Sequence, residues 1–342
     1  MTAGRQTMTS SPLSANPKFA RAYGLIADKL ARVEEELLLH FRSPIPTIDG
    51  IGSYLASGGG KRIRPALLLL SARLLGYEEG DKDVRYATVV EFIHTATLVH
   101  DDIIDEARLR RGRTSANARW GNNLTVLFGD YLYTKSMGIA LDEGDLTILK
   151  VLSDTTLSMI EGEIIAIEKM GNIHITREEA LDIIRRKTAD LFAAACRLPA
   201  HFSPLGDLFA AERLAEYGRC LGIAFQLIDD LLDYTSSEET VGKPVLNDLR
   251  EGKLTIPLLL ALPQASARER ELVATVLKER EFRSVEPADI LEIVARAKSV
   301  AEVRALARDY AAAARVAITA FPDSDAKEGL LLATESVIDR VS

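Results

Sequence analysis

Apolar residues recur three or four positions apart along almost the whole chain, the spacing that places them on one face of an α-helix. The alternation typical of β-strands is almost absent. The pattern predicts helices over residues 18–41, 48–56, 62–76, 81–105, 123–141, 144–169, 176–198, 206–234, 254–262, 266–280, 287–297, 299–321 and 325–340. The sequence therefore predicts an all-α fold, a single large helical bundle rather than a simple four-helix bundle.

Composition gives an ordinary globular balance, with 47% hydrophobic and 27% charged residues among 342. Residues 1–17 are rich in Ser, Thr, Ala and Pro, and we expect a disordered tail there. They lack the apolar core of a signal peptide, and with Arg5 alone they make a poor transit peptide. Because neither a linker nor a composition shift follows, the sequence predicts one domain over residues 18–342.

Charge and cysteine content narrow the functional classes. The net charge of −8 argues against a nucleic-acid binder and against adsorption on anionic lipid. No run reaches the ~18 apolar residues of a membrane-spanning helix. Cys196 and Cys220 lie in apolar helical stretches, and their spacing matches no zinc motif. Buried free thiols are typical of a reducing compartment, so we expect a cytoplasmic protein.

One acidic pattern occurs twice, and each copy interrupts a strongly apolar run. The first copy contains Asp101, Asp102 and Asp105, and the second contains Asp229, Asp230 and Asp233. Carboxylates are costly to bury unless a metal or a cation compensates their charge. Magnesium prefers oxygen ligands and binds through one or two carboxylates together with substrate phosphates. The repeat therefore predicts a cavity for several divalent cations and a diphosphate, the alternative being two solvated acidic patches.

Two basic clusters stand out against this acidic background. Three glycines, Gly58 to Gly60, let the backbone approach a ligand closely, and Lys61 and Arg64 follow where a helix begins. Residues 108–113 contain four arginines, more than the capping of a helix C-terminus requires. We interpret both clusters as phosphate-binding; solvated surface charge is the alternative.

Further polar candidates lie on or near the same helices. His94 precedes Asp101 by seven residues, and Gln226 precedes Asp233 by seven, so each shares a helix face with its cluster. Lys187 precedes an apolar run and either points inward or snorkels to the surface. The polar segment 235–253 carries Lys243. We interpret it as a flap that excludes water during chemistry, with a plain loop as the alternative.

These residues resemble the trans-type isoprenyl diphosphate synthases, over nearly the whole chain from about Lys18. The resemblance implies a single large helical bundle of the isoprenoid synthase type with a central substrate cavity. The matching segments are GGKRIRP (59–65), EFIHTATLVHDDIID (91–105), RRGRTSAN (110–117), GDYLYTK (129–135), KTADLF (187–192), GIAFQLIDDLLDY (222–234), GKP (242–244) and DLREGKLTIP (248–257). Several long motifs in this order are specific. The sequence around His94 and Asp101 is most similar to that of the octaprenyl, solanesyl and decaprenyl diphosphate synthases. One departure is Leu246, where family members often have glycine.

The resemblance implies a reaction in which isopentenyl diphosphate adds head-to-tail to an allylic diphosphate, such as a farnesyl or geranylgeranyl primer. It also implies that isopentenyl diphosphate is bound by Gly60, Lys61, Arg64, His94 and Arg111, and that the allylic diphosphate is held by Arg110, Lys187, Gln226, Lys243 and Lys253. Magnesium would be bound by Asp101, Asp105 and Asp229 and supported by Asp102, Asp230 and Asp233, of which Asp233 is also counted among the metal residues. The allylic cation would be faced by Thr188 and Gln226. The catalytic candidates are the five aspartates other than Asp233, namely Asp101, Asp102, Asp105, Asp229 and Asp230, together with Lys187, Thr188, Gln226 and Lys243.

The physical logic of this reaction is electrostatic. Ionisation of a C–O bond builds negative charge on diphosphate, which metal ions and fixed cations stabilise. The carbocation must be kept from water, and a closed apolar cavity does this. No nucleophilic side chain is required.

Product length is expected to depend on residues below the first aspartates. Val90, Ile93, Ala96 and Thr97 would line the path of the growing chain, and none is aromatic. Family members that stop at farnesyl tend to carry bulky rings at the positions of Ala96 and Thr97. Each helical turn adds roughly one isoprene unit of depth, at ~1.5 Å per residue. We therefore expect an octaprenyl to decaprenyl product, for a quinone side chain.

Three alternatives stay open. A geranylgeranyl or farnesyl synthase would differ only at the floor of the tunnel. A terpene cyclase would not need the Lys61, Arg64 and His94 cluster, and its second metal motif differs from DDxxD. A regulatory subunit would be expected to lose one aspartate cluster. The resemblance also implies a homodimer, with residues 123–141 as a candidate interface, and leaves association with a membrane for product release open.

Overall fold

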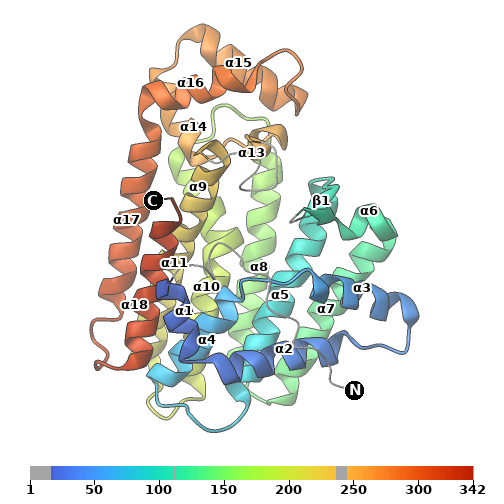
Figure 1. The fold of residues 1–342 in the computed structure, drawn as a ribbon, viewed down its shortest axis with the longest axis vertical. Helices are drawn as coiled ribbons and strands as arrows, with labels where there is room; N and C mark the ends of the chain where they lie inside the picture. The colour runs from blue at the N-terminus through green and yellow to red at the C-terminus, as the bar shows by residue number, and fades with distance from the viewer. Residues whose placement is uncertain (1–16, 111, 236–244, 342) are drawn as a thin grey trace. The chain divides into compact units, whose positions relative to one another are not determined.

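The structure, a computed structural model, describes residues 17–110, 112–235 and 245–341. These residues are almost entirely helical, with one two-stranded hairpin, so the all-α prediction is confirmed (Figure 1). The predicted tail lies outside the described residues except for Pro17. The chain divides into two compact units. The first comprises Met1–Asp145, Phe202–Leu205 and Pro322–Ser336, and the second comprises Leu146–His201, Gly206–Phe321 and Val337–Ser342. One synthase domain over 18–342 and a central cavity stay predictions.

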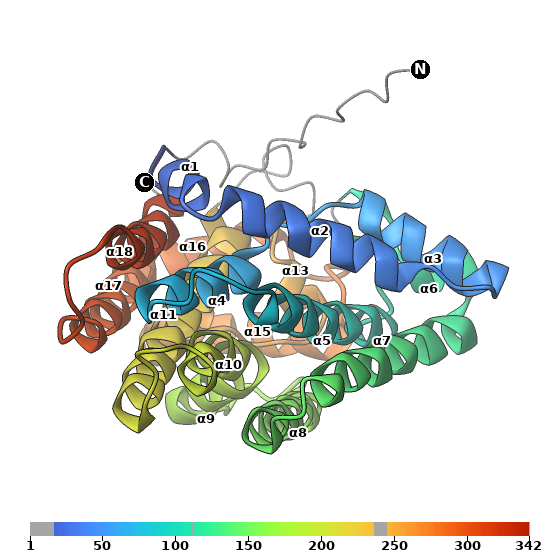
Figure 2. The same cartoon turned by 90° about the horizontal axis from the view of Figure 1, so that it is seen from below.

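The first unit is built around two apolar helices. It contains α1 (Pro17–Gly24), α2 (Ala27–Phe41), α3 (Pro46–Ser57), α4 (Ile63–Leu74), α5 (Lys82–Ile104), β1 (Leu109–Arg110), β2 (Arg113–Thr114), α6 (Ala116–Trp120), α7 (Asn122–Asp142) and all but the last two residues of α18 (Asp325–Ile338). Residues 65–72 of α4 are all buried, as expected of a helix that is apolar all round. α4 and α7 both pack against α5 (Figure 2).

The second unit is centred on the longest helix of the described chain, α11. It contains α8 (Leu146–Lys169), α9 (Arg177–Ile184), the π-helix η1 (Arg185–Ala189), α10 (Asp190–Arg197), η2 (Leu198–His201), α11 (Leu208–Thr235), α13 (Asn247–Arg250), α14 (Ile256–Ala261), η3 (Leu262–Gln264), α15 (Ala267–Glu279), α16 (Pro287–Ala297), α17 (Ser299–Ala317) and η4 (Asp339–Val341). α10 and α17 pack along α11. Gly218 permits the close approach of α10, since a Cβ there would lie 2.4 Å from the Phe192 carbonyl oxygen.

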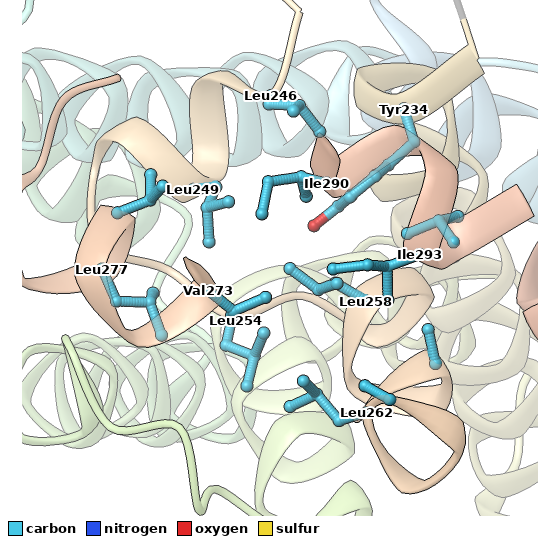
Figure 3. Packing of buried hydrophobic residues seen from close by; sticks show 14 of the residues in the cluster. Tyr234, Leu246, Leu249, Leu254, Leu258, Leu262, Val273, Leu277, Ile290 and Ile293 are labelled. Atoms are coloured by element: carbon cyan, nitrogen blue, oxygen red, sulfur yellow. The ribbon is translucent and has the colours of Figure 1, made fainter. Parts of the chain in front are cut away.

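An apolar cluster in the second unit holds the end of α11 and the segment from Leu246 onward (Figure 3). Leu246 is fully buried in it and has the left-handed backbone conformation, φ +57°. That conformation costs a non-glycine residue about 1–2 kcal/mol. Burial of a leucine side chain contributes about 1.5–3 kcal/mol. Leucine can therefore take a left-handed conformation that favours glycine, because the burial of its side chain offsets the cost.

Helix boundaries agree with the predictions to within a few residues, with three differences. The predicted helix 18–41 is divided into α1 and α2, and the predicted helix 176–198 contains a π-helical turn. The hairpin of β1 and β2 and the short helices α6 and α13 were not predicted. Elements this short carry too few residues for periodicity to reveal them. The hairpin turns at Gly112, whose φ is +72°.

Candidate active site

The first aspartate cluster lies at the C-terminal end of α5, the negative end of the helix dipole, where carboxylates need cations nearby. Asp101 and Asp105 are half-buried, whereas Asp102 is buried. Arg110 Nε donates to Asp102 Oδ1 at 2.5 Å, and Arg110 comes from strand β1. The hairpin therefore places Arg110, which is predicted to bind diphosphate, beside the aspartate cluster.

A contact from α7 supports the same end of α5. His100 Nε2 lies 3.1 Å from the Val126 carbonyl oxygen and 3.5 Å from Asp130 Oδ1. A Cβ at Gly129 would lie 2.2 Å from His100 Nε2, so only glycine allows this approach. Gly129 and Asp130 belong to the family motif GDYLYTK, but the sequence alone predicts no role for either residue.

A pocket in the first unit brings several predicted residues together. It is lined by His94 and Asp102 of α5, by Arg110 of the hairpin, and by Gly58 and Gly59 of the glycine loop. Gly60, Lys61 and Arg64 are not among its lining residues. The pocket thus joins the glycine loop, one face of α5 and the hairpin.

Arg62, which the sequence analysis did not select, holds the glycine loop in place. Arg62 Nη1 donates to Glu91 Oε1 at 2.6 Å, and Nη2 donates to Glu34 Oε2 at 3.0 Å. The Tyr23 hydroxyl donates to the Lys61 carbonyl. Burial lowers the pKa of Arg64 to about 10, and Glu91 opposes this shift. Arg64 therefore stays protonated at neutral pH.

The second aspartate cluster, on α11, has a different environment at each carboxylate. Asp229 is exposed, and Arg340 Nη2 donates to its Oδ1 at 3.1 Å. Asp230 is buried and accepts from Gln226 Nε2 at 2.8 Å. Asp233 accepts from the backbone N–H groups of Asn247 and Asp248, both at 3.0 Å, and so fixes the start of α13.

Burial also changes the charge state of this cluster. It raises the pKa of Asp230 to about 7; the hydrogen bond from Gln226 lowers it, and the carboxylates of Asp229 and Asp233 raise it further. Burial, with Asp233 and Asp230, likewise holds the pKa of Asp248 well above its usual range. A cation bound here would relieve the repulsion between these carboxylates.

Lys187 and Thr188 lie on the π-helix η1. Thr188 Oγ1 donates to Gln226 Oε1 at 2.9 Å, so Thr188, Gln226 and Asp230 form one chain of hydrogen bonds. Lys187 is paired with Glu163 of α8. Single π-helical turns are frequent at functional sites. The local geometry thus groups three of the predicted catalytic residues.

The remaining predicted residues are placed as follows. Arg111 and Lys243 lie outside the described residues. Lys253 Nζ lies 2.7 Å from Glu251 Oε2. Val90, Ile93 and Ala96 are buried in the first unit, Thr97 is half-buried, and none of the four lines the pocket.

No group of three or more His, Cys, Asp or Glu side chains in the described part of the chain is arranged to hold a metal ion by itself. Among residues 17–110, 112–235 and 245–341, no helix is long and apolar enough to cross a membrane.

Comparison with known proteins identifies the family. Residues 45–294 match the family model described as polyprenyl synthetase, and the chain belongs to this family. Over 309 residues it is 40% identical to the octaprenyl diphosphate synthase of Escherichia coli, which covers 90% of this chain and 94% of that one. The family predicted from the sequence motifs is thereby confirmed.

Two crystal structures have the same fold. The polyprenyl synthase of Caulobacter crescentus, complexed with calcium and isoprenyl diphosphate, superimposes with a TM-score of 0.89 at 34% identity, over 95% of this chain and 98% of that one. The decaprenyl diphosphate synthase of Rhodobacter capsulatus superimposes with a TM-score of 0.87 at 34% identity, over 95% of this chain and 99% of that one. The helical fold is therefore that of polyprenyl synthases.

Proposed function

We propose that this protein is a long-chain trans-polyprenyl diphosphate synthase, which adds isopentenyl diphosphate head-to-tail to an allylic diphosphate. The observation that carries the proposal is the 40% identity, over 90% of the chain, to an octaprenyl diphosphate synthase. Both aspartate clusters are complete, which disfavours a regulatory subunit. The basic cluster at Lys61 and Arg64 provides for a second diphosphate, which a terpene cyclase would not need.

Isopentenyl diphosphate is proposed to bind at the glycine loop and the facing residues of α5. The proposed ligands are Gly60, Lys61, Arg64, His94 and Arg111. Support comes from the pocket that joins the loop, His94 and the hairpin. Bidentate arginine and a lysine point charge suit a diphosphate.

The aspartate clusters are proposed to bind magnesium, and the chemistry of the donors fits a hard divalent ion. Asp101 and Asp105 are half-buried and Asp229 is exposed, so these carboxylates suit direct ligation. Asp102 and Asp230 are buried with side-chain partners and suit a supporting role, as does Asp233, whose oxygens accept backbone hydrogen bonds. When bound, magnesium stabilises the charge that develops on the departing diphosphate.

Protein cations act on the same leaving group. Arg110, Lys187, Lys243 and Lys253 are proposed to hold the allylic diphosphate. Thr188 and Gln226 are proposed to turn oxygen dipoles toward the carbocation. Fixed dipoles and cations stabilise charge without the reorganisation that water would need.

The small side chain of Ala96 is proposed to leave room for a long product chain. Val90, Ile93 and Thr97 belong to the same helix and lack aromatic rings. A product of eight to ten isoprene units is proposed, serving as a quinone side chain. The comparisons with octaprenyl and decaprenyl synthases support this length over a geranylgeranyl or farnesyl product.

We also propose a cytoplasmic homodimer that meets the membrane when it releases product. Leu124, Leu127 and Leu141 of α7 are large apolar side chains that are exposed. Apolar surface left exposed on a helix is typical of an interface.

The test is incorporation of labelled isopentenyl diphosphate into an apolar product, with farnesyl diphosphate as primer. We expect incorporation with magnesium and loss of incorporation when magnesium is chelated. Asp101→Ala and Asp229→Ala should each abolish it while the far-UV circular dichroism is unchanged. A wild-type protein that incorporates nothing in magnesium would contradict the proposal.

A further inference from the structure

Three consecutive residues of α8 contact the π-helix η1, and no motif quoted from the sequence includes them. Glu161 Oε2 lies 2.5 Å from Arg186 Nη1, and the Glu163 carboxylate pairs with the Lys187 ammonium. Between them, Gly162 lies against the π-helical turn. A Cβ there would be 2.6 Å from the Cβ of Arg186 and 3.2 Å from the backbone nitrogen of Lys187.

The two ion pairs differ in exposure. The Glu161 side chain is 49% exposed, whereas those of Glu163 and Lys187 are 17% and 23% exposed. Exposed ion pairs contribute little because water screens them, and a pair with less water around it interacts more strongly. Glu163 is therefore the residue of α8 that constrains Lys187.

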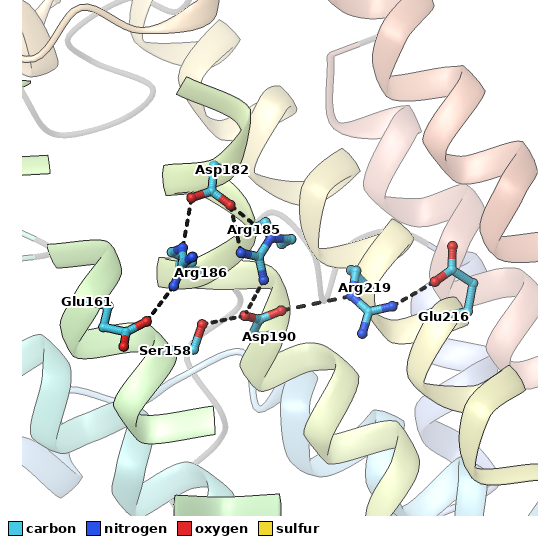
Figure 4. A network of polar contacts seen from close by, with 8 residues as sticks. All are labelled: Ser158, Glu161, Asp182, Arg185, Arg186, Asp190, Glu216 and Arg219. Atoms are coloured by element: carbon cyan, nitrogen blue, oxygen red, sulfur yellow. Dashed lines mark hydrogen bonds and ion pairs between the residues drawn. The ribbon is translucent and has the colours of Figure 1, made fainter. Parts of the chain in front are cut away.

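Other side-chain contacts flank the same turn (Figure 4). Arg185 Nη2 donates to Asp182 Oδ1 at 2.6 Å, and Arg186 Nε donates to Asp182 Oδ2 at 2.8 Å. Asp190, just after the turn, accepts from Arg185 Nη1 at 3.0 Å and from Ser158 Oγ of α8 at 2.7 Å. The side chains on both sides of Lys187 are therefore paired within the second unit, and the long side chain of Lys187 needs a restraint of its own.

We propose that Glu163 is a positioning residue for prenyl transfer, and that Gly162 seats the turn that carries Lys187. The inference rests on the proposed function, in which Lys187 holds the allylic diphosphate. Lysine has three N–H donors, so its ammonium can keep Glu163 as a partner and still donate to a phosphate oxygen. Glu163 thereby holds the cation in place before substrate arrives, which reduces the ordering that binding requires.

The test is steady-state kinetics with each of the two substrates varied separately. Glu163→Ala should lower kcat/KM for the allylic diphosphate by on the order of tenfold to a hundredfold, the scale of a misplaced catalytic group. Glu163→Gln keeps an oxygen acceptor, so its kcat/KM for the allylic diphosphate should fall less than that of Glu163→Ala. The KM for isopentenyl diphosphate should be unchanged in both. Gly162→Ala should show the same allylic defect, because its methyl group would push the turn away from α8.

Glu161→Gln is the matched control, since it removes the same charge two residues away, from the more exposed ion pair with Arg186. This variant should leave kcat/KM for the allylic diphosphate and the KM for isopentenyl diphosphate unchanged. Equal losses for both substrates in Glu163→Gln, or no loss in either Glu163 variant, would overturn the inference. The wild-type enzyme is assayed beside them: failure of the wild type to elongate at all would count against the proposed function instead.

Discussion

Arg340 near the C-terminus donates through Nη2 to Asp229 Oδ1 at 3.1 Å, and so neutralises a carboxylate proposed to bind magnesium. The Arg340 side chain is only 13% exposed and its guanidinium lies 5.0 Å from the centre of the Phe225 ring. The pair is thus held by packing on one side, while Asp229 faces solvent on the other.

This relationship predicts competition between Arg340 and magnesium. In Arg340→Gln the metal no longer has to displace a guanidinium, so the magnesium concentration for half-maximal activity should fall. A partly exposed ion pair contributes up to about 1 kcal/mol, which corresponds to a few-fold change. Titration of activity with magnesium measures it. Arg315→Gln, in α17, serves as a control for the loss of one positive charge, and a rise in the magnesium requirement of Arg340→Gln would contradict the prediction.

A second prediction concerns pH and the buried carboxyl of Asp230. Its pKa of about 7 lies above the ordinary value of 3.8, so between these values the folded state binds more protons than the unfolded state. The stability of the metal-free protein should therefore lose a contribution as pH rises from about 4 to 7. Asp230→Asn removes this loss, so its Tm relative to wild type should be higher at pH 8 than at pH 5. A difference in Tm that is constant over this range would contradict the assignment.

A third prediction concerns the contact between Gly129 and His100. Gly129→Ala would place a methyl group within 2.2 Å of His100 Nε2 and should displace the ring from Val126 and Asp130. We expect a lower Tm and weaker magnesium-dependent activity, because the end of α5 carries Asp101. Gly138→Ala is the matched control on α7, since a Cβ there meets nothing within 4 Å. Alanine is favoured over glycine in a helix by about 1 kcal/mol, so the control should be neutral or stabilising.

A fourth prediction concerns product length. Ala96→Phe should shorten the product, because a ring at this buried position would close the proposed path of the growing chain. Overpacking of a core costs about 1–3 kcal/mol, so a lower Tm is also expected. Thr97→Phe, at a half-buried position, tests the same path at less cost in stability. Products of unchanged length in both variants would remove these residues from the wall.

The sequence predicted the helical fold and the two aspartate clusters because both depend on short-range patterns. A separation of seven residues is enough to place His94 on the same helix face as Asp101, and an apolar run is enough to predict α5. Gly129 and Glu163 could not be selected in this way. Their roles depend on His100 and Lys187, residues on other helices, and a helical pattern gives no information on which helices meet.

The loop after the second aspartates shows a different limit. The presence of Leu246 in place of glycine raised the question of whether the turn is kept, because leucine rarely adopts positive φ. The structure shows that Leu246 adopts positive φ, with its side chain buried beside Leu249. Burial of that side chain depends on α15 and α16, which follow much later in the chain and could not be assigned to this core beforehand.

The length of the product is the measurement that tests the central claim most directly. Purified protein would be incubated with farnesyl diphosphate, excess isopentenyl diphosphate and magnesium, and the products resolved by mass spectrometry. A long-chain synthase predicts products of eight to ten isoprene units. A product that stops at four units or fewer would contradict it and would mean that a side chain other than Ala96 or Thr97 closes the path near the site.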